Sequence, residues 1–489
     1  MPIMVERKKW ILYKHTCNFE LVKAVALDVK NSCKTDISDK ERRHMQERLA
    51  ILNLYKARNP MEKPLDAINH RINTLEYWMF GYEQKIEGQK RFMFSPLGNL
   101  FLKYINDNEK IKKIFLTMLF AMQFQHPGSG TDKSFQLYPF RLILKLLMDS
   151  RLDYKLYNFE VEYITVFLKT IDKVSYESLV KDMLSMRSMS SEEIALLFKE
   201  DEHTYVNTVY EWEYYTQKLL SMAQVWDYTK GELICKLSHP SKTNSKSKPT
   251  SRSATRGYVS LNKDLVDFAE KLLNKYSYEQ VPLSLADSER LTIDIIKEIY
   301  SFYPKILLDE IGETKDLFNS EILELPKLIE EYSNNNDNKQ AYLFEDVLVK
   351  GFNMFYNVEA EKIGGAGHTD IECLYISKKK KFAVESKSTA NKLPGINAGR
   401  LRSHREEIAA DYTIVVTPRY VPAVLHDIYE TPIVIIRAST LSEYLYNHIF
   451  NDVREIDYED FDSIIVDNLG KDISKVISDK TIEKFAARG

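Results

Sequence analysis

The stretch of sequence that decides the fold of the C-terminal part reads Ile363-Gly-Gly-Ala-Gly-His-Thr-Asp370-Ile-Glu372-Cys-Leu-Tyr-Ile-Ser-Lys-Lys-Lys-Lys-Phe-Ala-Val-Glu385-Ser-Lys387. Apolar and polar residues alternate after Asp370, as they do in a strand with one buried face. A second strand follows over 382–387, and the lysine-rich run 377–381 supplies the turn between them. The sequence therefore predicts a β-hairpin in which Glu385 and Lys387 share one face.

Two carboxylates and an ammonium group converge on this hairpin if Asp370 lies opposite Glu385. Carboxylate oxygens are good ligands for Mg²⁺, which lowers the pKa of a bound water and offsets charge in phosphodiester hydrolysis. Lys387 can orient or deprotonate the attacking water and help to neutralise the scissile phosphate. Because crowded carboxylates are unfavourable without a cation, we predict a Mg²⁺-dependent hydrolytic site made of these three residues.

The order Asp370, hairpin turn, Glu385-Ser-Lys387 resembles the PD-(D/E)xK nuclease motif, with Thr369 where that family usually has Pro. The family often places a further carboxylate on a helix upstream of the hairpin. Glu345 in the segment 342–352 matches this position, so the resemblance implies that it is a catalytic and metal-binding residue. An ordinary charged surface hairpin without chemistry is the alternative.

A helix and two apolar strands are expected to complete the C-terminal core. Arg400 and His404 lie four residues apart and share one face of the helix, where they would contact DNA. Solvated charges on an amphipathic helix explain the same two residues equally well. Segments 412–417 and 432–437 are apolar almost throughout, which is typical of buried strands in a mixed sheet.

The chain before residue 237 is predicted to be mainly helical, with one hairpin inside it. Segments 77–86 and 89–94 flank Glu87-Gly88 as its two strands, and Ser95-Pro-Leu-Gly98 then caps the next helix. This order resembles a winged-helix module, which commonly presents a helix to the major groove and its wing to the DNA backbone. Any helical domain with one hairpin is the alternative.

A basic stretch, 233–263, contains no Asp or Glu. Its middle, 238–256, is rich in Ser, Lys and Pro and is predicted to be a flexible basic loop. Cationic side chains that reach phosphates add affinity that depends on salt and not on sequence. A solvated linker or long loop that touches nothing is an equal alternative. Strand-like flanks at 232–236 and 257–261 would make it a long hairpin loop and not a domain junction. The candidate DNA contacts here are Lys246, Lys248, Arg252 and Arg256.

The length of 489 residues exceeds what one hydrophobic core usually serves. We expect a DNA-recognition region at 1–275, a helical linker at 276–339 and a nuclease domain at 340–489. The fold class is therefore multidomain α+β, with a mainly helical recognition region and a C-terminal α/β restriction-endonuclease-like core built on a mixed sheet.

Composition narrows the class of protein. Hydrophobic residues make up 44% and charged residues 28%, as in soluble globular proteins. The net charge of −3 argues against a general polyanion-coating protein, although a DNA enzyme can concentrate its basic groups on one surface. The four cysteines form no Cys-x-x-Cys pair, which excludes a Cys-rich zinc module. Without a signal peptide or a long apolar run, we expect a cytoplasmic protein with no membrane association.

The whole chain resembles type IIS restriction endonucleases of the AlwI and PleI kind and their nicking relatives. The matching stretches are Phe94-Ser-Pro-Leu-Gly98, Phe124-Gln-His-Pro127, Tyr138-Pro-Phe140 and Phe344-Glu345. The resemblance implies a double-stranded DNA substrate, a short asymmetric site, cleavage at a fixed offset and a companion DNA methyltransferase. One active site cuts one strand, so cutting both requires a transient homodimer or a second nuclease subunit.

Three other hypotheses stay open. One is a strand-nicking enzyme, and another is a modification-dependent defence nuclease with an aromatic cage for a flipped methylated base. The third is a DNA-binding protein with a decayed nuclease core. Retention of Asp370, Glu385 and Lys387 argues against decay, which usually removes one of the three.

Overall fold

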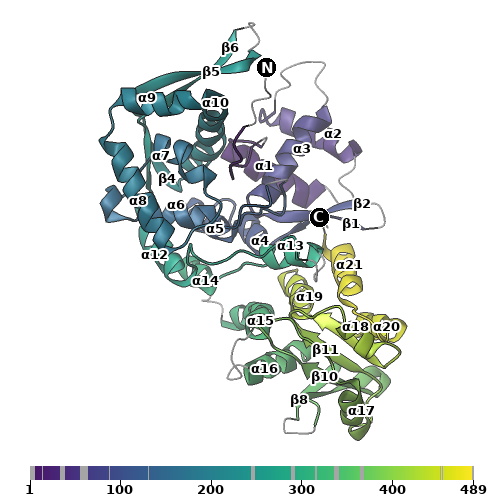
Figure 1. The fold of residues 1–489 in the computed structure, drawn as a ribbon. Coiled ribbons are helices and arrows are strands. Elements are labelled where there is room, and N and C mark those ends of the chain that lie inside the picture. The colour runs from purple at the N-terminus through teal and green to yellow at the C-terminus, as the bar shows by residue number, and fades with distance from the viewer. Residues whose placement is uncertain are drawn as a thin grey trace. The chain divides into compact units, whose positions relative to one another are not determined.

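The protein folds into two compact units, Met1–Ala286 and Asp287–Arg488, seen here in a computed structural model (Figure 1). Each unit is described by itself. Among the described residues, no helix is long and apolar enough to span a membrane. The structure describes residues 6–13, 15–32, 39–55, 64–86, 89–129, 132–243, 248–287, 292–313, 317–334, 341–363, 368–451, 453 and 455–486.

The first unit begins with helices and the predicted hairpin. Strands β1 and β2 pair antiparallel from Gly81↔Phe94 to Ile86↔Gln89, which confirms the hairpin. The hydroxyl of Ser95 accepts a hydrogen bond from the backbone nitrogen of Gly98 at 3.0 Å and caps the next helix, as predicted. The elements are α1 (Phe19–Ser32), α2 (Asp39–Ile51), α3 (Pro64–Tyr77), β1 (Gly81–Ile86), β2 (Gln89–Phe94) and α4 (Pro96–Lys103).

The rest of the first unit is helical around two small sheets. Strands β3, β7 and β4 form one sheet in that order, and β5 pairs with β6 in the other. The elements are α5 (Asn108–Ala121), α6 (Pro139–Leu147), η1 (Ser150–Leu152), β3 (Leu156–Tyr157), α7 (Asn158–Tyr163), η2 (Thr165–Phe167), α8 (Lys173–Ser188), α9 (Ser191–Glu200), α10 (Glu202–Tyr210), η3 (Glu211–Gln217), α11 (Lys218–Met222), β4 (Trp226–Thr229), β5 (Leu233–Thr243), β6 (Pro249–Thr255), β7 (Tyr258–Leu261), η4 (Lys263–Leu265) and α12 (Val266–Lys275).

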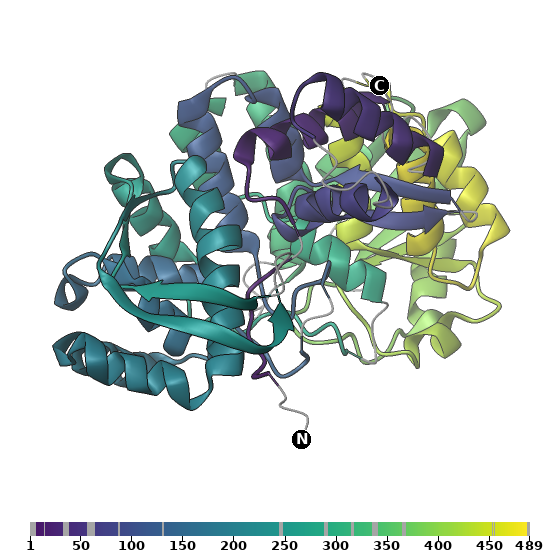
Figure 2. The same cartoon turned by 90° about the horizontal axis from the view of Figure 1, so that it is seen from above.

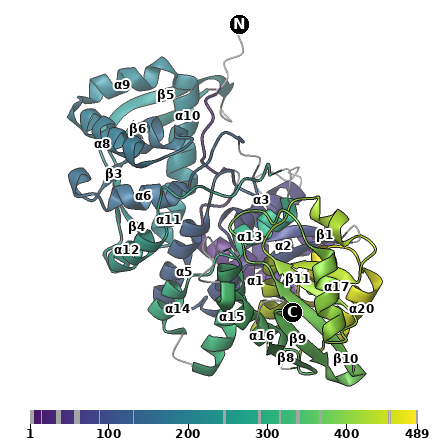
Figure 3. The same cartoon turned by 60° about the horizontal axis from the view of Figure 1, so that its bottom comes forward.

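The flexible basic loop expected over 238–256 is wrong. Strands β5 and β6 cover most of it as an antiparallel hairpin beside α9 and α10, visible as the long teal arrows of Figure 2 and labelled in Figure 3. Leu237 and Ala254 are fully buried and pack in the core beneath it. Ser and Thr hide this period-two pattern in the sequence, because they are as common in loops as in strands. Residues 244–247, between the strands, lie outside the described residues.

The second unit is built on a mixed five-stranded sheet, which confirms the expected sheet type. Its order is β12-β11-β10-β9-β8, with β8, β9 and β10 antiparallel and β10, β11 and β12 parallel. The strands are β8 (Val358–Lys362), β9 (Ile371–Tyr375), β10 (Lys380–Ser386), β11 (Thr413–Thr417) and β12 (Ile433–Arg437). The helices are α13 (Thr292–Tyr300), α14 (Lys305–Ile311), α15 (Leu317–Ser333), α16 (Ala341–Phe352), η6 (Ile376–Lys378), α17 (Ala398–Glu407), α18 (Val424–Ile428), α19 (Ala438–Phe450), α20 (Glu459–Asp467) and α21 (Ser474–Phe485).

Helices cover both faces of this sheet. Phe382 and Val384 of β10 point into a core shared with α15, α16, α19 and α20. Val415 of β11 points the other way, into a smaller core with Leu401 of α17 and Val424 of α18. Because side chains alternate along a strand, Glu385 lies on the α17 face.

Helices α13, α14 and α15 fall within the segment expected as a linker, yet they belong to this second unit. Ile329 of α15 is fully buried in the core that α16 and α19 share. Asp294 of α13 is ion-paired with Arg437 at the end of β12, and both side chains are buried. Tertiary contacts therefore attach α13 and α15 to the core of this unit.

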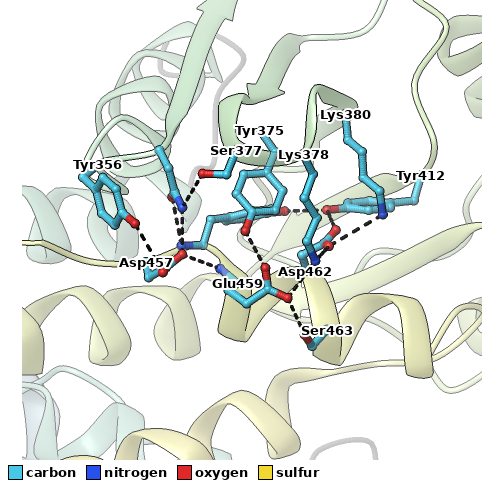
Figure 4. A network of polar contacts seen from close by, with 12 residues as sticks. Tyr356, Tyr375, Ser377, Lys378, Lys380, Tyr412, Asp457, Glu459, Asp462 and Ser463 are labelled. Atoms are coloured by element: carbon cyan, nitrogen blue, oxygen red, sulfur yellow. Dashed lines mark hydrogen bonds and ion pairs between the residues drawn. The ribbon is translucent and has the colours of Figure 1, made fainter.

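The turn between β9 and β10 is fastened to α20 by a polar network (Figure 4). Asp462, which is 1% exposed, accepts hydrogen bonds from the Tyr412 hydroxyl at 3.1 Å and the Lys378 ammonium at 2.9 Å. Glu459 accepts from the Tyr375 hydroxyl at 2.6 Å and also from Lys378, at 2.7 Å. These contacts fix the turn end of the hairpin, which is the end away from Asp370.

Candidate active site

Asp370 lies just before β9, and its carboxylate is held by the end of β10. Ser386 donates to the same oxygen, Oδ2, from its backbone nitrogen at 2.7 Å and from its hydroxyl at 2.9 Å. The register of the two strands pairs Ile371 with Val384, so one further step sets Asp370 opposite Glu385. The hairpin therefore brings the two carboxylates together on one side of the sheet.

Glu385 is 1% exposed, which is unusual for a carboxylate. Its Oε1 accepts a hydrogen bond from the Lys387 ammonium, which is 32% exposed, at 2.5 Å. Burial raises the pKa of Glu385, the Lys387 charge opposes that shift, and the charge of Asp370 adds to it. Thus two carboxylates and one lysine form a single electrostatic group.

His404 of α17 is buried, with 4% of its surface exposed, and so does not lie on an open helix face as a contact with DNA would require. Its Nδ1 lies 4.0 Å from Oε2 of Glu385, and its Nε2 accepts a hydrogen bond from Nε of the exposed Arg400 at 3.4 Å. The packing of Leu401 against the sheet turns this face of α17 inward. Arg400 stays exposed at the edge of the site.

Glu345 lies on α16, where its Oε2 is 2.9 Å from the Lys362 ammonium of β8. The same ammonium contacts Asp346 at 2.9 Å. In the described part of the chain, no three His, Cys, Asp or Glu side chains are grouped as metal ligands. The structure brings Asp370, Glu385 and Lys387 together, whereas Glu345 is engaged by Lys362.

The candidate DNA contacts on the basic stretch differ in their surroundings. Lys246 lies outside the described residues, and Lys248 is exposed. The guanidinium of Arg252 lies 4.2 Å from the centre of the Tyr210 ring. Arg256 is used within the protein, because it donates to the carbonyl of Met189 at 2.6 Å and to Ser191 Oγ at 3.1 Å.

The donor set suits a hard divalent cation. Within the described residues, nothing donates a hydrogen bond to the buried Oε2 of Glu385. A buried carboxylate oxygen without a partner is costly, and a cation or a bound water would satisfy it. Asp370 and Glu385 supply oxygen ligands of the kind that Mg²⁺ takes.

Comparisons with known proteins identify the family of this chain. The model of the family "Type II restriction endonuclease HgaI, N-terminal domain" matches residues 5–276. The type II restriction enzyme HgaI of Avibacterium volantium is 50% identical over 477 residues, which cover 97% of each chain. The chain belongs to the HgaI family of type II restriction endonucleases. This agrees with the expected resemblance at the level of type II restriction endonucleases.

Solved structures of the restriction endonuclease FokI, alone and bound to DNA, are also similar to this HgaI-family chain. They are 10% and 11% identical, with TM-scores of 0.27 and 0.26, over 96% of this chain and 100% of theirs.

Sequence reasoning misses two contacts of the site in this HgaI-family protein. Ser386 carries no chemistry of its own, and only its position between Glu385 and Lys387 marks it. Lys362 lies on β8, which pairs with β9. Its ion pair with Glu345 forms only because α16 packs beside β8, and the sequence does not show that packing. Both are partners of charged groups that the sequence does identify.

Proposed function

We propose that this restriction endonuclease of the HgaI family is a Mg²⁺-dependent type IIS enzyme with a PD-(D/E)xK active site in its second unit. It hydrolyses double-stranded DNA at a fixed offset from a short asymmetric sequence. The observation that carries the proposal is the buried Glu385, which lies beside Asp370 and Lys387 and has an unsatisfied carboxylate oxygen.

Each residue has a definite part in this mechanism. Asp370 and Glu385 would hold the ion, which when bound activates water and offsets charge on the phosphate. Lys387 positions the attacking water and neutralises the scissile phosphate with an ammonium that is partly open to solvent. Ser386 holds Asp370 in one orientation. His404 fills the space behind Glu385, and Arg400 at the edge meets the DNA backbone.

Glu345 is proposed as a further carboxylate of the site, on the strength of the nuclease motif. Its present partner Lys362 is 32% exposed and also contacts Asp346. Release of Glu345 would therefore leave the lysine one carboxylate partner.

Sequence recognition is assigned to the first unit. The hairpin β1–β2 and the capped helix α4 supply the wing and a following helix of a winged-helix module. The basic hairpin β5–β6 supplies cations for phosphates. The proposed enzyme is cytoplasmic and acts beside a companion methyltransferase. Double-strand cleavage would require a homodimer or a second nuclease subunit.

The test is cleavage of plasmid DNA with Mg²⁺. The wild-type protein should give discrete fragments, whereas Asp370→Ala and Glu385→Ala should give none and still bind DNA in a gel-shift assay. Glu372→Gln is a matched control, because this carboxylate lies on the same hairpin but pairs with Lys381. Random fragments, or full activity in Asp370→Ala, would overturn the site assignment.

Run-off sequencing of the fragment ends identifies the recognition sequence and the offset. It also separates double-strand cleavage from nicking, because a nicking enzyme leaves one strand continuous. Activity confined to methylated plasmid would favour the modification-dependent alternative. Specific binding without any cleavage would favour a decayed nuclease core.

A further inference from the structure

A continuous helical run in the first unit is interrupted by a π-helix. The π-helix η3 (Glu211–Gln217) lies directly between α10 and α11. Such wider turns are rare and occur frequently at functional sites, because they displace side chains from their regular helical positions. Here several side chains of η3 line one cavity together with Arg252 of the hairpin β5–β6.

A cavity of about 630 Å³ opens at this point, a volume within the range of small-ligand sites. Part of its wall is aromatic. The rings of Tyr210 and Tyr214 stack at 5.1 Å with an interplanar angle of 15°, and Tyr228 contributes a third ring. Two cations also line it and lie over its rings: Arg252 is 4.2 Å from the centre of the Tyr210 ring, and Lys218 is 5.3 Å from that of Tyr214. The buried Nε of Arg252 has no hydrogen-bond partner in the described part of the chain.

An acidic pair lies beneath the aromatic wall. Glu213 lines the cavity and accepts a hydrogen bond from Asn158 at 3.1 Å. Behind it Glu162 is 0% exposed, and neither of its carboxylate oxygens has a hydrogen-bond partner in the described structure. Burial and the charge of Glu213 raise the pKa of Glu162 well above its ordinary value, and burial raises the pKa of Glu213 to about 7. A ligand that donates a hydrogen bond to Glu213 would stabilise this pair.

The chemistry of the wall describes a ligand with three properties. It has a flat π face for the tyrosines, an N–H donor for Glu213 and an anionic group near Lys218 and Arg252. A nucleotide of DNA has all three. Bases within a duplex are read by convex elements that enter a groove, whereas a concave cavity accepts only a nucleotide that has left the stack.

We propose that this cavity receives a nucleobase rotated out of the DNA duplex, which packs against its aromatic wall and donates an N–H to Glu213. This inference rests on the proposed function and adds a base-reading site to the first unit. The phosphates that flank the extruded nucleotide contact Lys218 and Arg252, and the basic hairpin continues that contact along the backbone.

The test uses the full-length protein and duplexes that contain its recognition sequence, with Ca²⁺ in place of Mg²⁺. At each position in turn, the base on the opposite strand is replaced to create a mismatch, and affinity is measured by fluorescence anisotropy. A mismatch weakens the pair that extrusion must break, so at one position binding should tighten by about tenfold. At positions read in a groove, the same change should weaken binding.

Glu213→Leu removes the hydrogen-bond acceptor, so it should abolish the tightening at that position and weaken specific binding about tenfold. Glu232→Leu is the matched control, because this exposed carboxylate lies next to the same hairpin and does not line the cavity. If Glu213→Leu does not fold, Tyr214→Leu and the wild-type mismatch series still decide the matter.

Specific binding with no tightening at any position would overturn the inference and leave the proposed function standing. Tightening that survives in Glu213→Leu would also overturn it, since the base would then enter elsewhere. Failure to bind any sequence specifically would instead contradict the proposed function.

Discussion

Ser386 gives both of its hydrogen-bond donors to one oxygen of Asp370, from its backbone nitrogen at 2.7 Å and its hydroxyl at 2.9 Å. Asp370 precedes β9 and Ser386 ends β10, so this contact joins the two strands at the carboxylate end of the hairpin. It holds the Asp370 carboxylate in one orientation. A carboxylate that binds metal depends on such partners for its geometry.

Ser386→Ala should therefore weaken divalent-ion binding and cleavage by about 10-fold or more, since loss of an outer partner typically costs about 10- to 100-fold. The backbone hydrogen bond is unaffected, so the thermal midpoint should change little. Calorimetric titration with Ca²⁺ and cleavage rates with Mg²⁺ measure the two effects. Ser403→Ala, at an exposed position of α17, is the control, and equal behaviour of the two variants would contradict the role of Ser386.

Arg256 and Arg252 should behave differently, although both belong to the basic stretch. Arg256→Gln should lower the free energy of unfolding by about 1–3 kcal/mol, because the Met189 carbonyl and the Ser191 hydroxyl both lose a charged donor. Arg252→Gln should instead reduce the slope of log affinity against log salt by about 1. Urea unfolding and DNA titrations over a salt series test this pair. The opposite pattern would show that Arg256 is the phosphate contact.

Asp462→Ala should destabilise the second unit by about 1–3 kcal/mol, because it leaves the buried Tyr412 hydroxyl and the Lys378 ammonium with fewer partners. Urea unfolding followed by circular dichroism measures the loss. Asp467→Ala, at the exposed end of the same helix, should have little effect. If both variants lose equal stability, the network of Figure 4 does not stabilise the hairpin.

The stability of the first unit should fall on acidification because of His126. Its Nδ1 accepts a hydrogen bond from the backbone nitrogen of Gly128, and its Nε2 lies against the carbonyl of Tyr77, to which it donates. This arrangement fits the neutral ring, which has one acceptor and one donor nitrogen. Burial lowers the pKa of His126 from 6.5 to about 4. Between these values the unfolded chain binds a proton that the folded chain does not, so stability is lost as pH falls from 6.5 to 4.

Thermal midpoints measured from pH 7 to pH 4 test this, with His126→Gln expected to show a shallower fall than the wild type. Parallel curves for the two proteins would exclude His126 as a source of the acid sensitivity.

A fragment of residues 341–489 should fail to fold, whereas 287–489 should fold cooperatively. The shorter fragment lacks α15, whose Leu325 and Ile329 are buried against α16 and α19. It also leaves Arg437 buried without Asp294. Proteolysis and near-ultraviolet circular dichroism of the two fragments distinguish the outcomes. A folded 341–489 fragment would support the linker expected over 276–339.

The sequence by itself determined the elements whose periodicity is local. The hairpin around Asp370 and Glu385, the apolar strands β11 and β12, and the Ser95 cap all follow from spacing along the chain, because backbone geometry sets the period. The same period places Glu385 and Lys387 on one face without knowledge of any neighbour.

Only the tertiary structure decided what that face meets. The burial of His404 against Glu385, the capture of Glu345 by Lys362 and the attachment of α15 to the sheet all depend on how distant helices dock. Docking sums many weak apolar contacts between residues far apart in sequence, so no local pattern contains it. The hairpin β5–β6 is the clearest case, since only burial of Leu237 and Ala254 distinguishes it from the loop that its composition suggests.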